Sequence, residues 1–250
     1  MTTLVSLVSG RHPVYHLLKA SRRAVRRIYF SAGVEKSEKK IVELISQKKI
    51  PLQVIDAKEL KKKVGEGVNH QGVVAETEDY PYVEFESLVS DGVCRLLMLD
   101  EIQDPQNVGA LCRSAYVLGF EGVILPQHNS ASISPGVCHA SVGAVEYLKI
   151  ARVTNFAMTI DALKEKRFWI YGADIEGAQD VTTEKFPEKV VLILGSEERG
   201  MRRLTREKCD VLLKISLSSE AEKNGVDSLN ASVAGGILMN EIFKTAKTQK

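Results

Sequence analysis

The chain has 250 residues, of which 44% are hydrophobic and 26% are charged, as in an ordinary globular protein. Because no run of 18 apolar residues occurs, we expect no membrane-spanning helix, and the first residues carry no pattern of a secretory signal. The net charge of +2 hides an asymmetry, since residues 1–80 hold 15 lysines and arginines against 9 acidic residues, a net charge of +6.

Short β-rich runs alternate with segments of helical period along the whole chain. We expect strands, in chain order, at 26–30, 52–57, 71–77, 95–100, 122–126, 146–153, 168–174, 190–195 and 210–216. We expect helices at 12–21, 36–48, 105–118, 155–166, 200–208 and 228–246. Alternating elements with continuous apolar strands predict an α/β fold around a buried, mostly parallel sheet.

The stretch 78–92 is acidic, contains a proline and interrupts the alternation. It predicts a linker between a small basic domain at 1–77 and a larger domain at 93–250. The basic charge of the first domain is concentrated in "RRAVRR" and "KKK". Such runs are usually solvated surface, but a basic face also suits binding to the phosphate backbone of nucleic acid. The candidate contacts are Arg22, Arg23, Arg26 and Arg27.

The four cysteines are scattered and form no C-x-x-C pair; they are Cys94, Cys112, Cys138 and Cys209. No histidine lies near them at the spacing of a metal site, so we expect no structural zinc or other metal. Reduced thiols in a cytoplasmic protein are the default interpretation. A catalytic cysteine would need a partner base that the sequence does not reveal.

The first polar strand exit reads "DPQNVGALCRSA" and follows the apolar run "LLMLD". Asp104 and Pro105 suit the N-cap and the first position of a helix. Asn107 then lies in the first turn, where free backbone N–H groups favour anions. Gly109 and Arg113 share one face of the helix, and the glycine leaves room beside the guanidinium. An amphipathic helix with an exposed arginine remains the alternative for this segment alone.

The second exit, "VVLILGSEERGM", runs from a strand into Gly195, followed by Glu197 and Gly200. It lacks the Lys-Ser/Thr of a P-loop, and the chain contains no G-x-G-x-x-G, so ordinary sites for nucleotides and dinucleotides are disfavoured. We therefore expect a tight turn where the backbone approaches a ligand beside a carboxylate.

The third exit leads into Ser228, Leu229 and Asn230 at the start of a helix that is rich in small residues. Ser228 is the expected N-cap of that helix. Because ligands of open α/β sheets bind beyond the carboxyl ends of the strands, the three exits together predict one composite site.

Three ordered motifs, N-x-G-x-x-x-R, G-x-E-x-x-G and S-L-N-x-S-x-A, resemble those of the SpoU-class (TrmH-type) RNA ribose 2′-O-methyltransferases. Within that family the chain is most similar to the bacterial enzymes that methylate guanosine in 23S rRNA. The stretch "NHQGVVAE" also resembles the end of the family's substrate-binding domain. The motif positions are Asn107, Gly109, Arg113, Gly195, Glu197, Gly200, Ser228, Leu229, Asn230, Ser232 and Ala234.

The resemblance implies a C-terminal α/β knot (SPOUT) domain with a deep trefoil knot, and a small N-terminal RNA-binding domain of the L30e-like type. It further implies a homodimer that acts on ribosomal RNA with S-adenosylmethionine as cofactor. The implied catalytic residues are Asn107, Arg113, Glu197, Ser228 and Asn230. The implied cofactor contacts are Gly195, Gly200, Ile215, Leu217 and Leu229.

In this scheme Arg113 binds RNA and stabilises the developing alkoxide, because a guanidinium with a pKa above about 12 is rarely a free base. Glu197 holds Arg113 or the substrate, while Asn107 orients Arg113 or the ribose. One departure is the run Ile215-Ser216-Leu217, where the family usually has I-P-M, followed by a longer loop to residue 227. The alternatives are a methyltransferase directed at tRNA and a non-catalytic RNA-binding protein that kept the fold.

Overall fold

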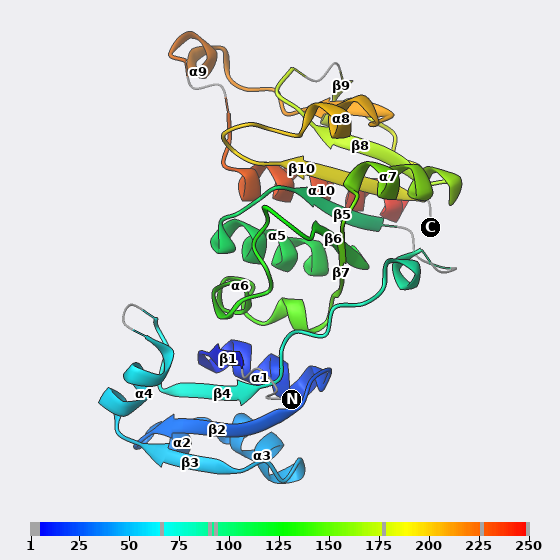
Figure 1. Cartoon of the computed structure of the whole chain (residues 1–250). Coiled ribbons are helices and arrows are strands. Elements are labelled where there is room, and N and C mark those ends of the chain that lie inside the picture. Colours follow the sequence, from blue (N-terminus) through cyan, green and yellow to red (C-terminus); the bar gives the residue numbers. More distant parts are fainter. Residues whose placement is uncertain are drawn as a thin grey trace. The chain divides into compact units, whose positions relative to one another are not determined.

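We describe the protein from a computed structural model, shown in Figure 1. The structure describes residues 6–65, 68–89, 92, 95–176, 179–225 and 228–248. The chain divides into two compact units: unit 1 is Met1–Pro81 with Ser132–Tyr147, and unit 2 is Tyr82–Ala131 with Leu148–Lys250. Within the described ranges, no helix is both long and apolar enough to cross a bilayer.

A four-stranded mixed sheet lies at the centre of unit 1. Its order is β1-β4-β2-β3, in which β4 runs antiparallel to both neighbours and β3 runs parallel to β2. The consecutive residues Ile28 and Tyr29 of β2 are both buried, so both faces of the sheet are covered. The strands are β1 (Ser6–Ser9), β2 (Val25–Ser31), β3 (Leu52–Ile55) and β4 (Val73–Thr77).

Helices cover this sheet and supply its core. The helix α4 begins after Asp56, whose side chain accepts a hydrogen bond from the N–H of Lys58 at 2.8 Å. Its Leu60 is fully buried and packs in one cluster with Tyr29 and Val74. The first four helices are α1 (Arg11–Ala20), α2 (Val34–Ser37), α3 (Lys39–Gln47) and α4 (Ala57–Val64).

Unit 1 also contains a segment from the middle of the chain, Ser132–Tyr147, with α6 (Pro135–Ala140) and the 3₁₀ turn η2 (Ala144–Glu146). Glu146 forms an ion pair with Arg23, and each side chain is 1% exposed. The sequence placed Arg23 among the RNA contacts, but its guanidinium is enclosed by this carboxylate and by the protein core. The pair attaches the segment to the connection between α1 and β2.

Replacing Arg23 by methionine should therefore destabilise the protein strongly, because Glu146 would remain buried without its cation. We expect a loss of about 3–5 kcal/mol in the free energy of unfolding. Thermal unfolding followed by circular dichroism should show a fall in Tm of roughly 10 °C. The matched control is Arg26→Met, an exposed arginine three residues along the same run, which should shift Tm little. Equal shifts in the two variants would contradict the structural role of Arg23.

Unit 2 is built on a seven-stranded sheet of order β7-β6-β5-β10-β8-β11-β9. All six of its described strand pairs are parallel, so the carboxyl ends of the strands lie at one edge. The strands are β5 (Arg95–Asp100), β6 (Gly122–Pro126), β7 (Lys149–Val153), β8 (Trp169–Ala173), β9 (Gln179–Asp180), β10 (Val190–Gly195) and β11 (Val211–Lys214).

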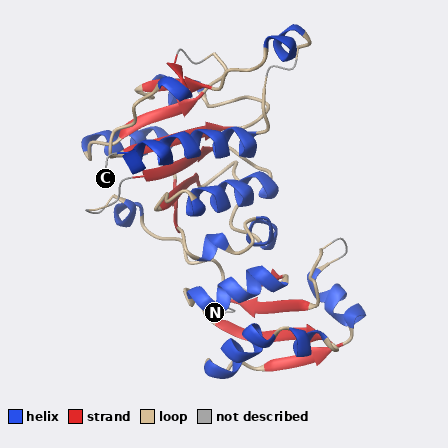
Figure 2. Cartoon of the chain, turned by 180° about the vertical axis from the view of Figure 1, so that it is seen from behind, coloured by secondary structure: helices blue, strands red, loops and turns tan. Residues whose placement is uncertain are grey.

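Helices lie on both faces of this sheet, as Figures 1 and 2 show together. On one face α10 packs against α5 and β10, and on the other α7 packs against β8 and α8. The helices are α5 (Pro105–Val117), α7 (Phe156–Glu165), α8 (Arg203–Glu207), α9 (Ser219–Lys223) and α10 (Ala231–Thr248). The 3₁₀ turns are η1 (Phe85–Leu88) and η3 (Val181–Thr183).

The predicted α/β fold with a mostly parallel sheet is confirmed, and each expected strand is present within a few residues of its predicted bounds. The expected helix at 36–48 is divided at Glu38, whose ψ of 51° interrupts it. Five helices and strands were not expected: β1, α4, α6, β9 and α9. The "KKK" run, for example, lies on α4, a short helix whose single buried residue gives little periodicity.

The expected linker at 78–92 is partly packed into unit 2. Leu88 of η1 is fully buried in the core of that unit, and Phe85 and Val89 pack against the same cluster. Positions 90 and 91 of the expected linker lie outside the described residues, as does Cys94.

Candidate active site

The start of α5 is built as its sequence predicts. The side chain of Asp104 accepts a hydrogen bond from the N–H of Gln106 at 2.9 Å, and Pro105 occupies the first helical position. Asn107 follows in the first turn and is only 7% exposed. Its amide is thus held at the carboxyl edge of the sheet, beside the exit of β5.

The turn after β10 requires glycine. A Cβ atom on Gly195 would lie 2.1 Å from the carbonyl carbon of Gly200 and 2.2 Å from the nitrogen of Met201. Ser196 and Gly200 close the turn with two backbone hydrogen bonds of 3.1 and 2.9 Å, and Gly200 has a φ of 65°. The backbone therefore doubles back on itself, and Glu197 projects from the turn.

The third element, α10, is capped by Asn230. Its side-chain oxygen accepts hydrogen bonds from the N–H groups of Ser232 at 3.0 Å and Val233 at 3.3 Å. The expectation that Ser228 caps this helix is wrong, because the helix begins three residues later, at Ala231. Oδ1 of Asn230 therefore accepts the capping hydrogen bonds, while its Nδ2 donates to other side chains.

Glu197 joins these three elements through one carboxylate oxygen. Its Oε1 accepts hydrogen bonds from Nδ2 of Asn107 at 3.0 Å and from the N–H of Ala231 at 3.1 Å. Nδ2 of Asn230 donates to the same oxygen and also to Oδ1 of Asn107, the latter at 3.1 Å. Because charge-assisted hydrogen bonds are stronger than neutral ones, this carboxylate fixes the ends of α5 and α10 against the turn.

A cleft of about 350 Å³ lies beside this network, within the size range of small-molecule sites. One wall is the loop after β5 and the other is the turn after β10. Its lining residues are Glu101, Ile102, Gln103, Asp104, Asn107, Ser196, Glu197, Glu198 and Arg199.

Two of the predicted catalytic residues are not part of the network. Arg113 is exposed and forms no hydrogen bond or ion pair with the part of the chain that the structure describes. Arg113 follows Asn107 by six residues on α5. At 3.6 residues per turn, the two side chains therefore point about 120° apart around the helix axis. Ser228 is exposed as well. The predicted contact between Glu197 and Arg113 is replaced here by the contacts of Glu197 with the two asparagines.

The predicted cofactor positions lie at the exits of β10 and β11 and before α10. Ile215 and Leu217 are half-buried, and Leu229 is 39% exposed. Between the first two, the hydroxyl of Ser216 donates a hydrogen bond to Asp180. Hydrogen bonds from Ser216 and then Thr182 lower the pKa of Asp180 to about 2. The loop after β11 is thereby attached to the neighbouring strand β9.

Cys138 and Cys209 are poor nucleophiles. Burial raises the pKa of Cys138 to about 11 and that of Cys209 to about 12, so both are protonated at neutral pH. Within the described ranges, no three histidine, cysteine or acidic side chains are grouped as metal ligands.

One ion pair at the site was not predicted. Asp100, the last residue of β5, is fully buried and binds the guanidinium of Arg202, 102 residues later. The only signal in the sequence is an aspartate at the end of an otherwise apolar strand. That pattern alone does not identify its partner.

Comparison with known proteins identifies the two parts of the chain. Residues 95–240 match the family model described as the SpoU rRNA Methylase family. Residues 7–83 match the model described as RNA 2'-O ribose methyltransferase substrate binding.

Full-length relatives agree with these matches. A protein of Bacillus subtilis (strain 168), named for the TrmH family of tRNA/rRNA methyltransferases, is 34% identical over 242 residues, which cover 95% of this chain and 94% of the relative. A relative of the same description from Staphylococcus haemolyticus is 32% identical and covers 95% of both chains.

Solved structures share the fold. The SpoU methyltransferase AviRb from Streptomyces viridochromogenes, in complex with AdoMet, aligns with a TM-score of 0.81 at 22% identity, over 98% of this chain and 91% of that one. An rRNA methyltransferase from Sinorhizobium meliloti aligns with a TM-score of 0.78 at 21% identity, over 96% and 86%.

A methylase domain preceded by a substrate-binding domain of RNA ribose methyltransferases, with a composite site at the carboxyl edge of its sheet, identifies the chain as an RNA methyltransferase. The chain belongs to the SpoU rRNA methylase family.

Proposed function

We propose that this protein methylates a ribose 2′-hydroxyl, of a guanosine, in 23S or other large-subunit ribosomal RNA. The observation that supports this most directly is the Glu197 carboxylate, which gathers Asn107 and Asn230 from motifs 123 residues apart into one site. The separate basic unit 1 favours a large RNA substrate, because it adds a second surface that can bind phosphates.

The cofactor of this class is S-adenosylmethionine, which supplies an electrophilic methyl group when bound. The residues at the edge of the sheet suit such a molecule, since Gly195 leaves no room for a side chain against the backbone of the turn, and Gly200 has a φ of 65° that favours glycine. The partly exposed Ile215, Leu217 and Leu229 offer apolar contacts of the kind that an adenine ring requires. We propose that these five residues hold the cofactor.

The proposed chemistry of the protein groups is positioning and charge stabilisation. We propose that the exposed guanidinium of Arg113 binds an RNA phosphate and stabilises the alkoxide that forms as the 2′-hydroxyl loses its proton. Asn107, Asn230 and Glu197 hold the helix ends that frame the cleft, and Ser228 lies beside Asn230 in the chain. Aligning the reacting oxygen is the main contribution of such a site.

Replacing Arg113 by lysine tests this role, because lysine keeps the positive charge and loses the two-pronged donor geometry. We expect kcat for methyl transfer to fall by about 100-fold, measured with labelled S-adenosylmethionine. Because Arg113 is exposed, Tm should stay unchanged. Turnover close to that of the unchanged protein would remove Arg113 from any essential role.

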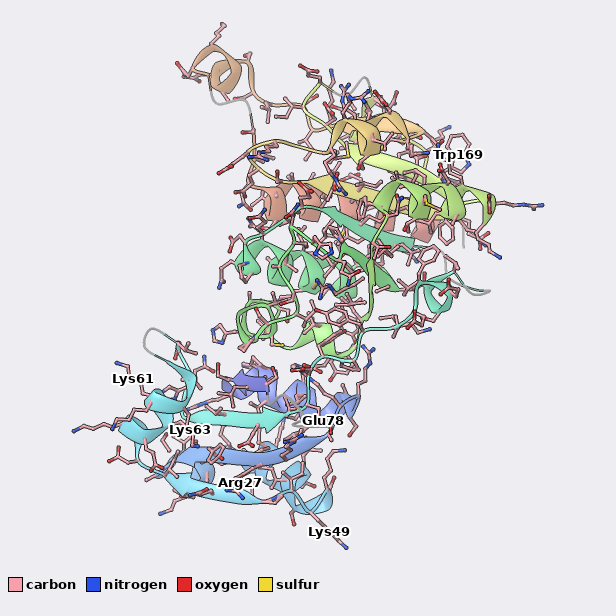
Figure 3. The ribbon with its side chains drawn as sticks, viewed as in Figure 1. Arg27, Lys49, Lys61, Lys63, Glu78 and Trp169 are labelled. Atoms are coloured by element: carbon pink, nitrogen blue, oxygen red, sulfur yellow. The ribbon has the colours of Figure 1, made fainter. Side chains whose placement is uncertain are left out.

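Unit 1 supplies the proposed RNA surface. Arg26 and Arg27 are exposed at the start of β2, and Arg22 is partly exposed, whereas the buried Arg23 is left out of this surface. Figure 3 shows Arg27 together with Lys61 and Lys63 of α4 in the same unit.

The double variant Arg26→Ala/Arg27→Ala should bind ribosomal RNA more weakly, with a shallower salt dependence. Each lost phosphate contact lowers the slope of log K against log salt by about one. Filter binding between 50 and 200 mM salt measures it. The control pair, Lys166→Ala/Lys185→Ala, removes two exposed cations of unit 2 and should leave the slope unchanged. An equal change of slope in both would contradict an RNA surface on unit 1.

We also propose a homodimer and a knotted chain, in the cytoplasm. The adjacent helices α5 and α10 carry exposed apolar side chains, namely Val117 at 68%, Val233 at 50% and Ile237 at 37% exposure. A second copy would cover them, since monomers rarely leave such groups together in solvent. The knot is supported by the start of α10, which is bound at the turn after β10 and whose body packs against β10 and α5.

A transfer RNA substrate is the second candidate, because the named relatives are described with both RNAs. Methyl incorporation into 23S rRNA and into bulk tRNA separates the two. A non-catalytic RNA-binding protein would give no incorporation into either, and no heat on titration with S-adenosylmethionine.

A further inference from the structure

We propose that Asp100 and Arg202 form a positioning pair that fixes the Glu197 turn for methyl transfer, and that neither residue contacts the reacting atoms. This inference rests on the proposed function of the same site. It concerns the ends of two adjacent strands, β5 and β10, which pair in parallel so that Asp100 lies opposite Gly195.

The geometry of the pair is specific. The Asp100 carboxylate accepts hydrogen bonds from the backbone N–H of Arg202 at 2.9 Å and from its Nε at 2.7 Å, and Nη2 lies 2.6 Å away. The Asp100 side chain is 0% exposed and that of Arg202 is 43% exposed. Nε and Nη2 both contact Oδ1, while the backbone N–H binds Oδ2. A lysine ammonium carries its donors on a single nitrogen, so it cannot reproduce the pair of contacts to Oδ1 from two nitrogens.

The pair closes the turn at both ends. The chain leaves the sheet at Gly195, beside Asp100, and returns at Arg202, which binds Asp100 again. The intervening residues include Glu197. One buried carboxylate therefore determines where the turn begins and where it ends, and so the position from which Glu197 reaches Asn107.

The same pair holds the opposite wall of the cleft. Glu101 follows Asp100 directly and has a φ of 59°, an uncommon conformation for a residue other than glycine. Nη1 of Arg202 lies 3.4 Å from its carboxylate. Both lining loops, after β5 and after β10, thus meet at one ion pair. An error there would move the two walls relative to each other, and a displacement of about 1 Å at such a site costs about 100-fold in rate.

Arg202→Lys and Asp100→Asn test the proposal in the full-length protein. We expect each variant to lower kcat by about 10-fold or more, while KM for S-adenosylmethionine and for RNA changes less than about twofold. The double variant should be no slower than the worse single variant, because both act through one interaction. Arg203→Lys is the matched control, since Arg203 is 84% exposed on the next position and should keep full kcat.

A purely structural pair would lower Tm and the folded fraction while leaving kcat per folded molecule unchanged, and that result would overturn the proposal. So would additive losses in the double variant. If Arg202→Lys does not fold, Asp100→Asn still tests the proposal. This variant leaves no buried charge at position 100, and the Arg202 side chain can turn toward solvent. If the protein without any substitution methylates no RNA, the proposed function itself is refuted. That result differs from a failure of the positioning proposal, in which the protein is active and the variants keep its kcat.

Discussion

Replacing Glu197 by alanine is expected to lower kcat for methyl transfer by about 1000-fold, the largest effect of any single change at the site. The variant removes the acceptor for the side chains of Asn107 and Asn230 and for the N–H of Ala231. These donors would be left without their partner at the mouth of the cleft, and the ends of α5 and α10 would no longer be fixed against the turn.

Two further variants make the result specific. Glu197→Gln keeps one carbonyl oxygen but no charge, so we expect it to lie between the alanine variant and the unchanged protein. Glu165→Ala removes an exposed carboxylate at the end of α7 and should have full activity. Activity of Glu197→Ala within threefold of the unchanged protein would contradict the central role of this carboxylate.

Replacing Gly195 by alanine should abolish the binding of S-adenosylmethionine. The new methyl group would lie 2.1 and 2.2 Å from backbone atoms of Gly200 and Met201, and no side chain can move aside to relieve that clash. The turn must therefore open, which we expect to weaken cofactor affinity at least 100-fold and to lower Tm by several degrees. Isothermal titration calorimetry measures the affinity.

The control for this variant lies at the other end of the turn. A Cβ atom on Gly200 would meet nothing within 4 Å, so Gly200→Ala bears only the cost of its φ of 65°. That cost is about 1–2 kcal/mol, and we expect at most a tenfold change in affinity. If Gly195→Ala bound the cofactor as tightly as Gly200→Ala, close backbone approach would not be the reason for the glycine.

The grouping of the site was predictable because parallel strands end at a common edge. Asn107, Glu197 and Asn230 each follow a predicted strand or loop at that edge, and the structure brings all three into contact. Which of them bond to each other depends on strand order. That β10 lies directly beside β5, although 90 residues separate their site residues, is not encoded in any local pattern.

The same reason explains what the sequence did not reveal. In "RRAVRR" the four arginines look equivalent, yet Arg23 alone is enclosed, because its partner Glu146 comes from a segment 123 residues away. The N-cap of α10 differs from the prediction by two residues, since both Ser228 and Asn230 suit a cap and only the packing around Glu197 favours the asparagine. Long-range partners decided each of these positions.

The most direct test is to incubate the purified protein with methyl-labelled S-adenosylmethionine and with either unmodified 23S rRNA or bulk tRNA. The labelled nucleoside is then identified by mass spectrometry. The expected result is one ribose 2′-O-methylated guanosine in 23S rRNA, absent with Glu197→Ala. Label in tRNA alone would contradict the ribosomal substrate, and no label in either RNA, from protein that is folded, would contradict methyl transfer itself.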